Sequence, residues 1–208
     1  MNREQEIAER FSRDIARHVM EIQNDNGLYR HLRFQRPETR DCYFDLITWP
    51  GHLAIAGDMG TFTFSRTRDM FEFFGDGEHG ISPGYWQEKI QAGAGSEGSR
   101  AITTEWDSEA HHRNVVREWK EWLEGNALPD PETTGEVKEY LRDNLLNCSD
   151  EYEAIAAVRE FDCPEAPGLL EDFWEYSDSR YQFHYLWCCH AIVWGIKHYR
   201  QREEKEAA

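Results

Sequence analysis

The sequence predicts an α+β protein: an N-terminal helix and a small antiparallel β-meander with flanking helices, followed by a helical half. Three observations support this fold class. Apolar residues recur at helical spacing near the N-terminus, alternate with polar residues between positions 28 and 65, and recur at helical spacing again beyond position 101. Glycine-containing turn signals punctuate the alternating region, which is typical of a meander.

The first helix is expected over residues 2–23, and the sequence "NDNG" at residues 24–27 is expected to end it. Its apolar residues recur at spacings of three and four: Ile7, Phe11, Ile15, Val19 and Ile22. Arginines occupy the remaining faces, so the helix is amphipathic. A short alternating strand follows at residues 28–34.

The stretch "CYFDLITWPGHLAIAGDMGTFTFS" predicts three antiparallel strands, and residues 28–34 are expected to add a fourth. Pro50 and Gly51 form a turn signal between the first two of the three strands, and "GDMG" forms a tight reversal before the last. We expect Gly57 and Gly60 to have positive φ, because a short reversal requires it.

The chain after the meander is predicted to be mainly helical. Ser82 and Pro83 are expected as the N-cap and first residue of one helix, and Ser149 as the N-cap of a later one. Further helices are expected at residues 68–74, at residues 107–124, from residue 129 onward, and at residues 180–203. The last is apolar around most of its middle, so we expect it at the centre of the fold.

The stretch at residues 91–100 is rich in Gly and Ser and is expected to be a loop. It separates an α/β part, residues 1–92, from an acidic helical part, residues 101–208. We expect the helical part to pack on the first part, so that the two form one compact unit.

Composition indicates a soluble protein of the cytoplasm. No stretch approaches the ~18 apolar residues that cross a bilayer, and the charged N-terminus lacks the apolar segment of a secretory signal. The five cysteines are an odd number without repeated spacing, which favours buried free thiols in a reducing compartment. No cofactor and no metal are expected.

The charge is strongly negative and uneven. The chain has 40 acidic and 23 basic residues, a net charge of −17, of which −4 lies in residues 1–100 and −13 in residues 101–208. Such a field disfavours direct binding to nucleic acid or to an anionic membrane, and it favours a protein partner with a basic surface.

Several long blocks resemble a widespread family of bacteriophage and prophage proteins. They are "LYRHLRF", "FDLITWPGHLAIAGDMGTFTFSR", "MFEFF", "ISPGYWQEKI" and "YLWCCHAIVWGI", and together they cover roughly residues 26–92 and 180–200. The resemblance implies a phage-encoded accessory protein in the cytoplasm of the host bacterium. It supplies no catalytic residues.

No catalytic set is expected among the polar residues. Asp45, Asp58 and Asp69 lie near the meander, but turn and cap positions account for the last two. His111 and His112 are adjacent and diverge on a helix, so they cannot simply chelate one metal. His184 and Cys188 have a spacing that ligands can use, yet nothing else in the sequence completes a zinc site.

Two alternatives remain open in the α/β part. Aromatic residues alternate with arginines over residues 29–36, a pattern that can bind single-stranded nucleic acid, although the net charge opposes it. A small-molecule binder or enzyme would instead need a pocket between sheet and helices, with Trp49, Trp86, His52 and Asp58 as candidate lining. A structural or assembly protein is a third class.

The acidic region is the most specific signal for function. Residues 136–178 contain 13 acids and three bases. Glu136, Glu139 and Asp143 share one helix face, where like charges cost a few tenths of a kcal/mol each. A merely solvated face is the alternative. We predict partner binding, by acidic mimicry of nucleic acid as in an anti-CRISPR or anti-restriction protein, through six residues: Glu136, Glu139, Asp143, Asp150, Glu151 and Glu153.

Overall fold

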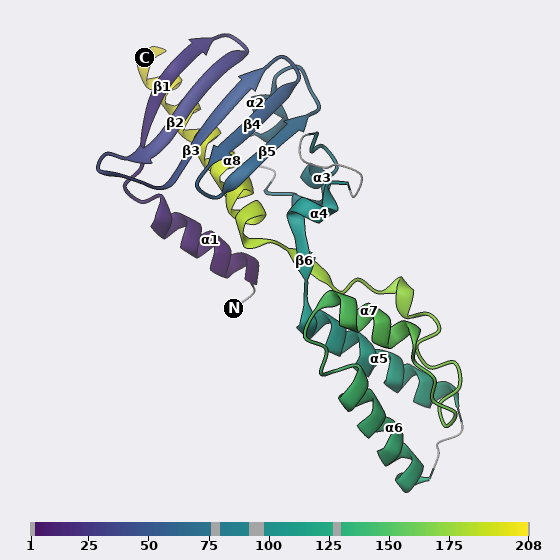
Figure 1. The fold of residues 1–208 in the computed structure, drawn as a ribbon. Helices are drawn as coiled ribbons and strands as arrows, with labels where there is room; N and C mark the ends of the chain where they lie inside the picture. Colours follow the sequence, from purple (N-terminus) through teal and green to yellow (C-terminus); the bar gives the residue numbers. More distant parts are fainter. Residues whose placement is uncertain (1–2, 76–79, 92–97, 127–129, 208) are drawn as a thin grey trace. The chain divides into compact units, whose positions relative to one another are not determined.

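The fold consists of two compact units, seen in a computed structural model that describes residues 3–75, 80–91, 98–126 and 130–207 (Figure 1). Residues 1–104 and 181–208 form the first, here named the sheet unit, and residues 105–180 form the second, here named the inserted unit. The N-terminal helix, the antiparallel sheet and the later helices confirm the predicted α+β class.

The sheet unit is built on a five-stranded antiparallel meander whose strands lie in sequence order. The strands are β1 (Val19–Asn26), β2 (Tyr29–Arg36), β3 (Thr39–Trp49), β4 (His52–Gly57) and β5 (Gly60–Ser65). The four predicted strands are confirmed as β2 to β5. Alternation sorts their side chains, so that Phe62 and Phe64 are buried while Thr61 and Thr63 are not.

The predicted first helix is too long. Helix α1 (Arg3–Asp14) ends nine residues early, and β1 occupies the expected last turns. Residues 19–23 fit both the helical spacing and the alternation of a strand, since Met20 and Ile22 also alternate with polar neighbours. Pairing of Met20 with Phe34 and of Ile22 with Leu32 decides for the strand, because it places both side chains against the core.

The turns use glycine for two different reasons. Gly51 and Gly60 have φ of 83° and 116°, as tight reversals require. The prediction of positive φ at Gly57 is wrong, since Gly57 is not among the positive-φ glycines. A Cβ at Gly57 would lie 2.2 Å from the Tyr43 carbonyl oxygen and 2.8 Å from the Phe44 Cα, so close backbone approach requires this glycine.

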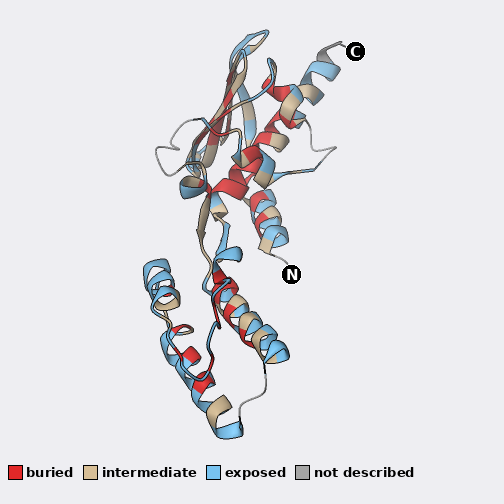
Figure 2. Cartoon of the chain, turned by 90° about the vertical axis from the view of Figure 1, so that its right-hand side faces the viewer, coloured by how far each residue is buried: buried red, intermediate tan, exposed pale blue. Residues whose placement is uncertain are grey.

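Helix α8 (Phe183–Ala207) covers one face of the sheet (Figure 1). Its residues Tyr185, Trp187 and Ile192 are fully buried in one cluster with Leu32 and Phe34 of β2. Figure 2 shows the buried residues gathered where α8 meets the sheet. The same core includes residues of α1, α2 (Met70–Phe74) and α3 (Pro83–Gln87). Helix α4 (Arg100–Thr103) is the last helix of the sheet unit before the chain enters the inserted unit.

The inserted unit has a separate core. It contains α5 (Ser108–Gly125), α6 (Pro131–Asn144), α7 (Glu151–Arg159) and the short 3₁₀ helix η1 (Phe173–Glu175). Its buried cluster includes Val115, Trp119, Leu141 and Leu145, and none of its members belongs to the sheet unit. The chain enters through β6 (Thr104–Trp106) and leaves through β7 (Ser179–Tyr181), which pair with each other.

The structural division differs from the predicted one, since it falls after residue 104 and returns residues 181–208 to the first unit. Residues 98–104 and helix α8 belong to the sheet unit. The apolar side chains of α8 are buried against the sheet, which explains its place there. Most of the predicted loop at residues 91–100 lies outside the described residues. Ser82 stands at the start of α3 before Pro83, as predicted, but its side chain makes no capping hydrogen bond.

Replacing Gly57 by Ala tests the close approach of β4 to β3. We expect G57A to lower the free energy of unfolding by about 3 kcal/mol, because the new methyl group meets backbone that cannot move without breaking the ladder. The control is G27A, because Gly27 has a φ of 61° but a Cβ there would have no atom within 4 Å. This change should lower the free energy of unfolding by only about 1 kcal/mol. Urea unfolding measures both, and equal losses would contradict the steric account.

Candidate functional site

The negative charge of the chain is concentrated on the inserted unit. Residues 105–180 contain 21 acidic and seven basic residues, a net charge of −14 out of −17. The rest of the chain carries 19 acids and 16 bases. Charge segregation therefore follows the structural division closely, and it places the electrostatic candidate for function on one separately cored unit.

Part of this charge has a structural explanation. Asp107, Asp130 and Asp150 are the N-caps of helices α5, α6 and α7, and each carboxylate accepts from one or two backbone N–H groups of the first turn. Glutamates in these first turns add favourable interactions with the helix dipole. About a third of the acids are accounted for in this way, and the others need another reason.

The acidic face of α6 has no such explanation. Glu136, Glu139 and Asp143 are exposed on the middle and end of the helix, beyond its first turn. The opposite side of the helix is anchored in the core by three buried residues: Val137, Leu141 and Leu145. Arg142 pairs with Glu139 at 3.1 Å and with Asp143 at 2.8 Å, which leaves the face with a net charge of −2.

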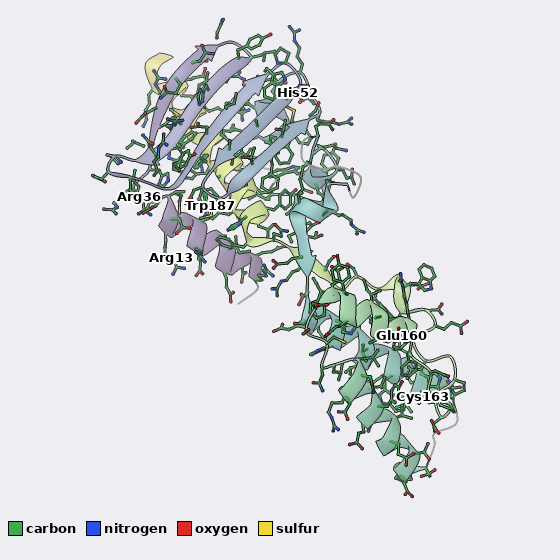
Figure 3. The ribbon with its side chains drawn as sticks, in the orientation of Figure 1. Arg13, Arg36, His52, Glu160, Cys163 and Trp187 are labelled. Atoms are coloured by element: carbon green, nitrogen blue, oxygen red, sulfur yellow. The ribbon has the colours of Figure 1, made fainter. Side chains whose placement is uncertain are left out.

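The acidic surface continues from α6 to α7 across an open groove of about 420 Å³. Asp143 of α6 lines this groove together with Glu153 and Glu160, and Glu160 is labelled in Figure 3. The structure thus brings two of the predicted residues together and adds Glu160. The spacing of Glu153 and Glu160, seven residues or two helical turns, is the signal that could have predicted the addition.

The other predicted site residues have different surroundings. Asp150, and not the predicted Ser149, is the N-cap of α7, since its carboxylate accepts from the backbone N–H of Glu153 at 2.9 Å. The Glu153 carboxylate in turn accepts from the backbone and side chain of Ser149, both at 2.8 Å. Glu151 lies on the opposite side of α7 from the groove, where a second hollow opens.

This second hollow, here named the aromatic hollow, has a volume of about 330 Å³. Glu151, Ile155 and Val158 line it from one side of α7. Aromatic side chains from segments distant in the sequence complete the walls: Trp106, Phe173, Trp174 and Tyr176. No local pattern predicts this hollow, because its walls converge only through tertiary packing.

His111 forms the floor of the aromatic hollow and is 1% exposed. Its Nδ1 lies 2.7 Å from Asp178 Oδ2, and its Nε2 lies 3.1 Å from the Leu145 carbonyl oxygen. The second Asp178 oxygen accepts a hydrogen bond from Asn114. Both ring nitrogens thus face acceptors, which ties α5 to the end of α6 and to the segment before β7.

Two carboxylates of the sheet unit, Asp45 and Asp69, are engaged in ion pairs. Arg33 donates two hydrogen bonds of 2.8 Å to Asp45, and Arg30 donates two of 3.0 Å to Asp69. Burial opposes the ionisation of Asp45, but hydrogen bonds from Arg33 and His31 outweigh it and hold the pKa of Asp45 below its usual range. These pairs are structural, and they occupy arginines that a nucleic-acid surface would need.

The four residues considered for a pocket between sheet and helices do not converge. Trp49 stacks on His52 at the β3–β4 turn, with ring centroids 4.9 Å apart. Asp58 lies at the other end of β4, where its carboxylate accepts from the Cys42 N–H. Trp86 is buried in the core against Phe74. No shared cavity is therefore built from these side chains.

Histidines and cysteines offer no metal centre in the part of the chain that the structure describes, where no three potential ligands gather. His184 is exposed while Cys188 is buried, so the pair does not act as one site. The thiols are free; Cys163, Cys188 and Cys189 are buried, and the other two are half-buried. Burial raises the pKa of the Cys188 thiol, which makes it a poor nucleophile.

Comparison of the chain with protein-family models, with curated proteins and with solved structures finds no match. Among the helices described, none combines the length and the apolar character that crossing a membrane requires. The candidate site therefore has to be judged on its own geometry and charge.

Replacing His111 by Phe tests the floor of the hollow. The change removes both imidazole contacts, the one with the Asp178 carboxylate and the one with the Leu145 carbonyl, and we expect the inserted unit to lose about 3 kcal/mol of stability. Its half-exposed neighbour provides the control, since H112F removes no such bonds and should change stability by less than about 0.5 kcal/mol. Amide hydrogen exchange within α5 and α6 measures both, and similar effects would contradict the assigned role.

Proposed function

We propose that this chain is a non-enzymatic accessory protein that binds a basic, nucleic-acid-binding surface of another protein through its inserted unit. The observation that carries the proposal is the acidic face of α6 together with the acidic groove beside it. Glu136, Glu139 and Asp143 are exposed and lie beyond the capping turn, and pairing with Arg142 leaves their face with a net charge of −2. A surface that keeps excess negative charge without a capping role is best explained by recognition.

The arrangement suits mimicry of a nucleic-acid backbone. Carboxylates from two helices line one groove at fixed positions: Asp143 on α6, Glu153 on α7 and Glu160 at the C-cap of α7. Fixed negative charges of this kind attract a positively charged surface over long range and increase the rate of association. Three of the unit's seven bases, Arg113, Arg117 and Lys120, lie on α5, which leaves the α6 and α7 surfaces predominantly acidic.

The cellular setting follows from the resemblance to bacteriophage proteins. In an infected bacterium, the partner would be a host protein that presents a positively charged groove to DNA or RNA. Effectors of CRISPR and restriction systems have such grooves, and a bound acidic protein would exclude the nucleic acid from them. An anti-defence role in the host cytoplasm is therefore the specific form of the proposal.

The test is capture of a partner from bacterial lysate on the immobilised protein, followed by affinity measurement with the purified partner. We expect the affinity to fall at least about tenfold between low and moderately high salt, because exposed charges are screened. The triple variant E136Q/E139Q/D143N should weaken binding by about tenfold at low salt. Double-stranded DNA should compete with the protein for the captured partner.

The matched control removes three exposed acids from the sheet unit, in the variant E38Q/D41N/E72Q. It changes the net charge equally, so a loss of affinity in both variants would indicate a general charge effect and contradict the assigned surface. Salt-insensitive capture, or no capture, would count against the proposal as a whole.

A further inference from the structure

The aromatic hollow is the feature of the inserted unit that acidic mimicry does not use. Its walls are mainly apolar, with Ile155 and Val158 from α7 and Phe173 from the segment before β7. Its size falls within the range of cavities that take up a side chain or a small ligand. The hollow and the acidic groove lie on opposite sides of the same helix, α7.

Large apolar side chains stand exposed at the edge of this hollow. Trp174 is 77% exposed and Ile155 is 43% exposed, although both border a cavity that could have covered them. An exposed tryptophan beside an apolar cavity is the composition of a binding hot spot. Trp174 contributes little to the core, while its neighbour Phe173 is buried there, so packing does not account for Trp174.

The polar atoms of the floor have no need of a ligand. Both His111 nitrogens face acceptors, and both Asp178 oxygens accept hydrogen bonds, one from His111 and one from Asn114. An apolar occupant would therefore leave the contacts between His111, Asp178 and Leu145 intact, whereas a polar occupant deep in the hollow would have to compete for them. This favours an apolar side chain in the hollow.

The charges around the hollow indicate which residues should flank that apolar side chain in the partner. Glu151 and Arg159 lie at its edge, and Glu171, Asp172 and Glu175 are exposed in the segment that carries Trp174. A segment with lysines or arginines on either side of an apolar residue would match this pattern. Its basic side chains would pair with the carboxylates at the edge, and its apolar side chain would be buried in the hollow.

We propose that the aromatic hollow receives an apolar side chain, aromatic or branched, projecting from a basic segment of the partner protein. The inference rests on the proposed function, since it takes the partner to be basic, and it adds an anchor that fixes where the partner sits. The carboxylates then provide long-range attraction, and the hollow provides short-range selectivity.

Two lysine-rich peptides of equal charge test the proposal, one with a central phenylalanine and the other with a central serine. Isothermal titration with the full-length protein should show the phenylalanine peptide binding about tenfold more tightly, the effect of burying one large apolar side chain. W174A and I155S change lining residues from two different segments, and each should reduce this ratio to about twofold or less.

Y152A is the matched control, since Tyr152 is 85% exposed on α7 but does not line the hollow. It should leave the ratio unchanged. A ratio near one in the unmodified protein, or a ratio that survives W174A and I155S, would overturn the anchor. Self-association of the protein that W174A abolishes would assign the hollow to a second copy, and would overturn it too.

The outcome separates the anchor from the proposed function. If both peptides bind equally, with affinity that falls with salt and with E136Q/E139Q/D143N, the anchor fails while the acidic surface retains its role. If neither peptide responds to salt or to these substitutions, the proposed function fails.

Discussion

Packing of α8 on the meander is the interaction on which the rest of the structure depends. Trp187 and Ile192 are fully buried, and each side chain of this kind contributes about 1.5–3 kcal/mol. Gly195 permits the close contact, since a Cβ there would lie 2.7 Å from Leu46 Cδ1 and 3.1 Å from a Phe34 ring carbon. Trp187, labelled in Figure 3, also donates a 3.1 Å hydrogen bond to Asp14 at the end of α1.

Because α8 comes last in the chain, the sheet unit closes only after residues 105–180 have been traversed. The buried cluster that α8 completes includes none of the described residues in that range, which bury their own apolar side chains around Trp119, Leu141 and Leu145. The pairing of β6 with β7 holds the entry and exit of the inserted unit together, with the Asp107 N–H donating to the Asp178 carbonyl at 2.8 Å. Surface charge on this unit can thus accumulate without weakening the sheet.

Local patterns predicted those parts of the molecule whose neighbours in space are neighbours in sequence. Strands β2 to β5 alternate and are joined by short turns, and the acidic face of α6 repeats at helical spacing, so both could be predicted. Strand β1 could not, because residues 19–23 satisfy two periods and only pairing with β2 decides between them. The aromatic hollow could not be predicted from local patterns either, since His111 and Asp178, which both line it, are 67 residues apart in the sequence.

The most direct test of the account replaces residues 107–178 by Asn-Gly, which closes β6 and β7 into a two-residue hairpin. We predict that the shortened chain still unfolds cooperatively with the near-UV signal of the buried tryptophans of the sheet unit. It should also lose salt-sensitive capture of the basic partner. Failure of the shortened chain to fold would contradict the separate cores, and retained capture would show that binding belongs to the sheet unit.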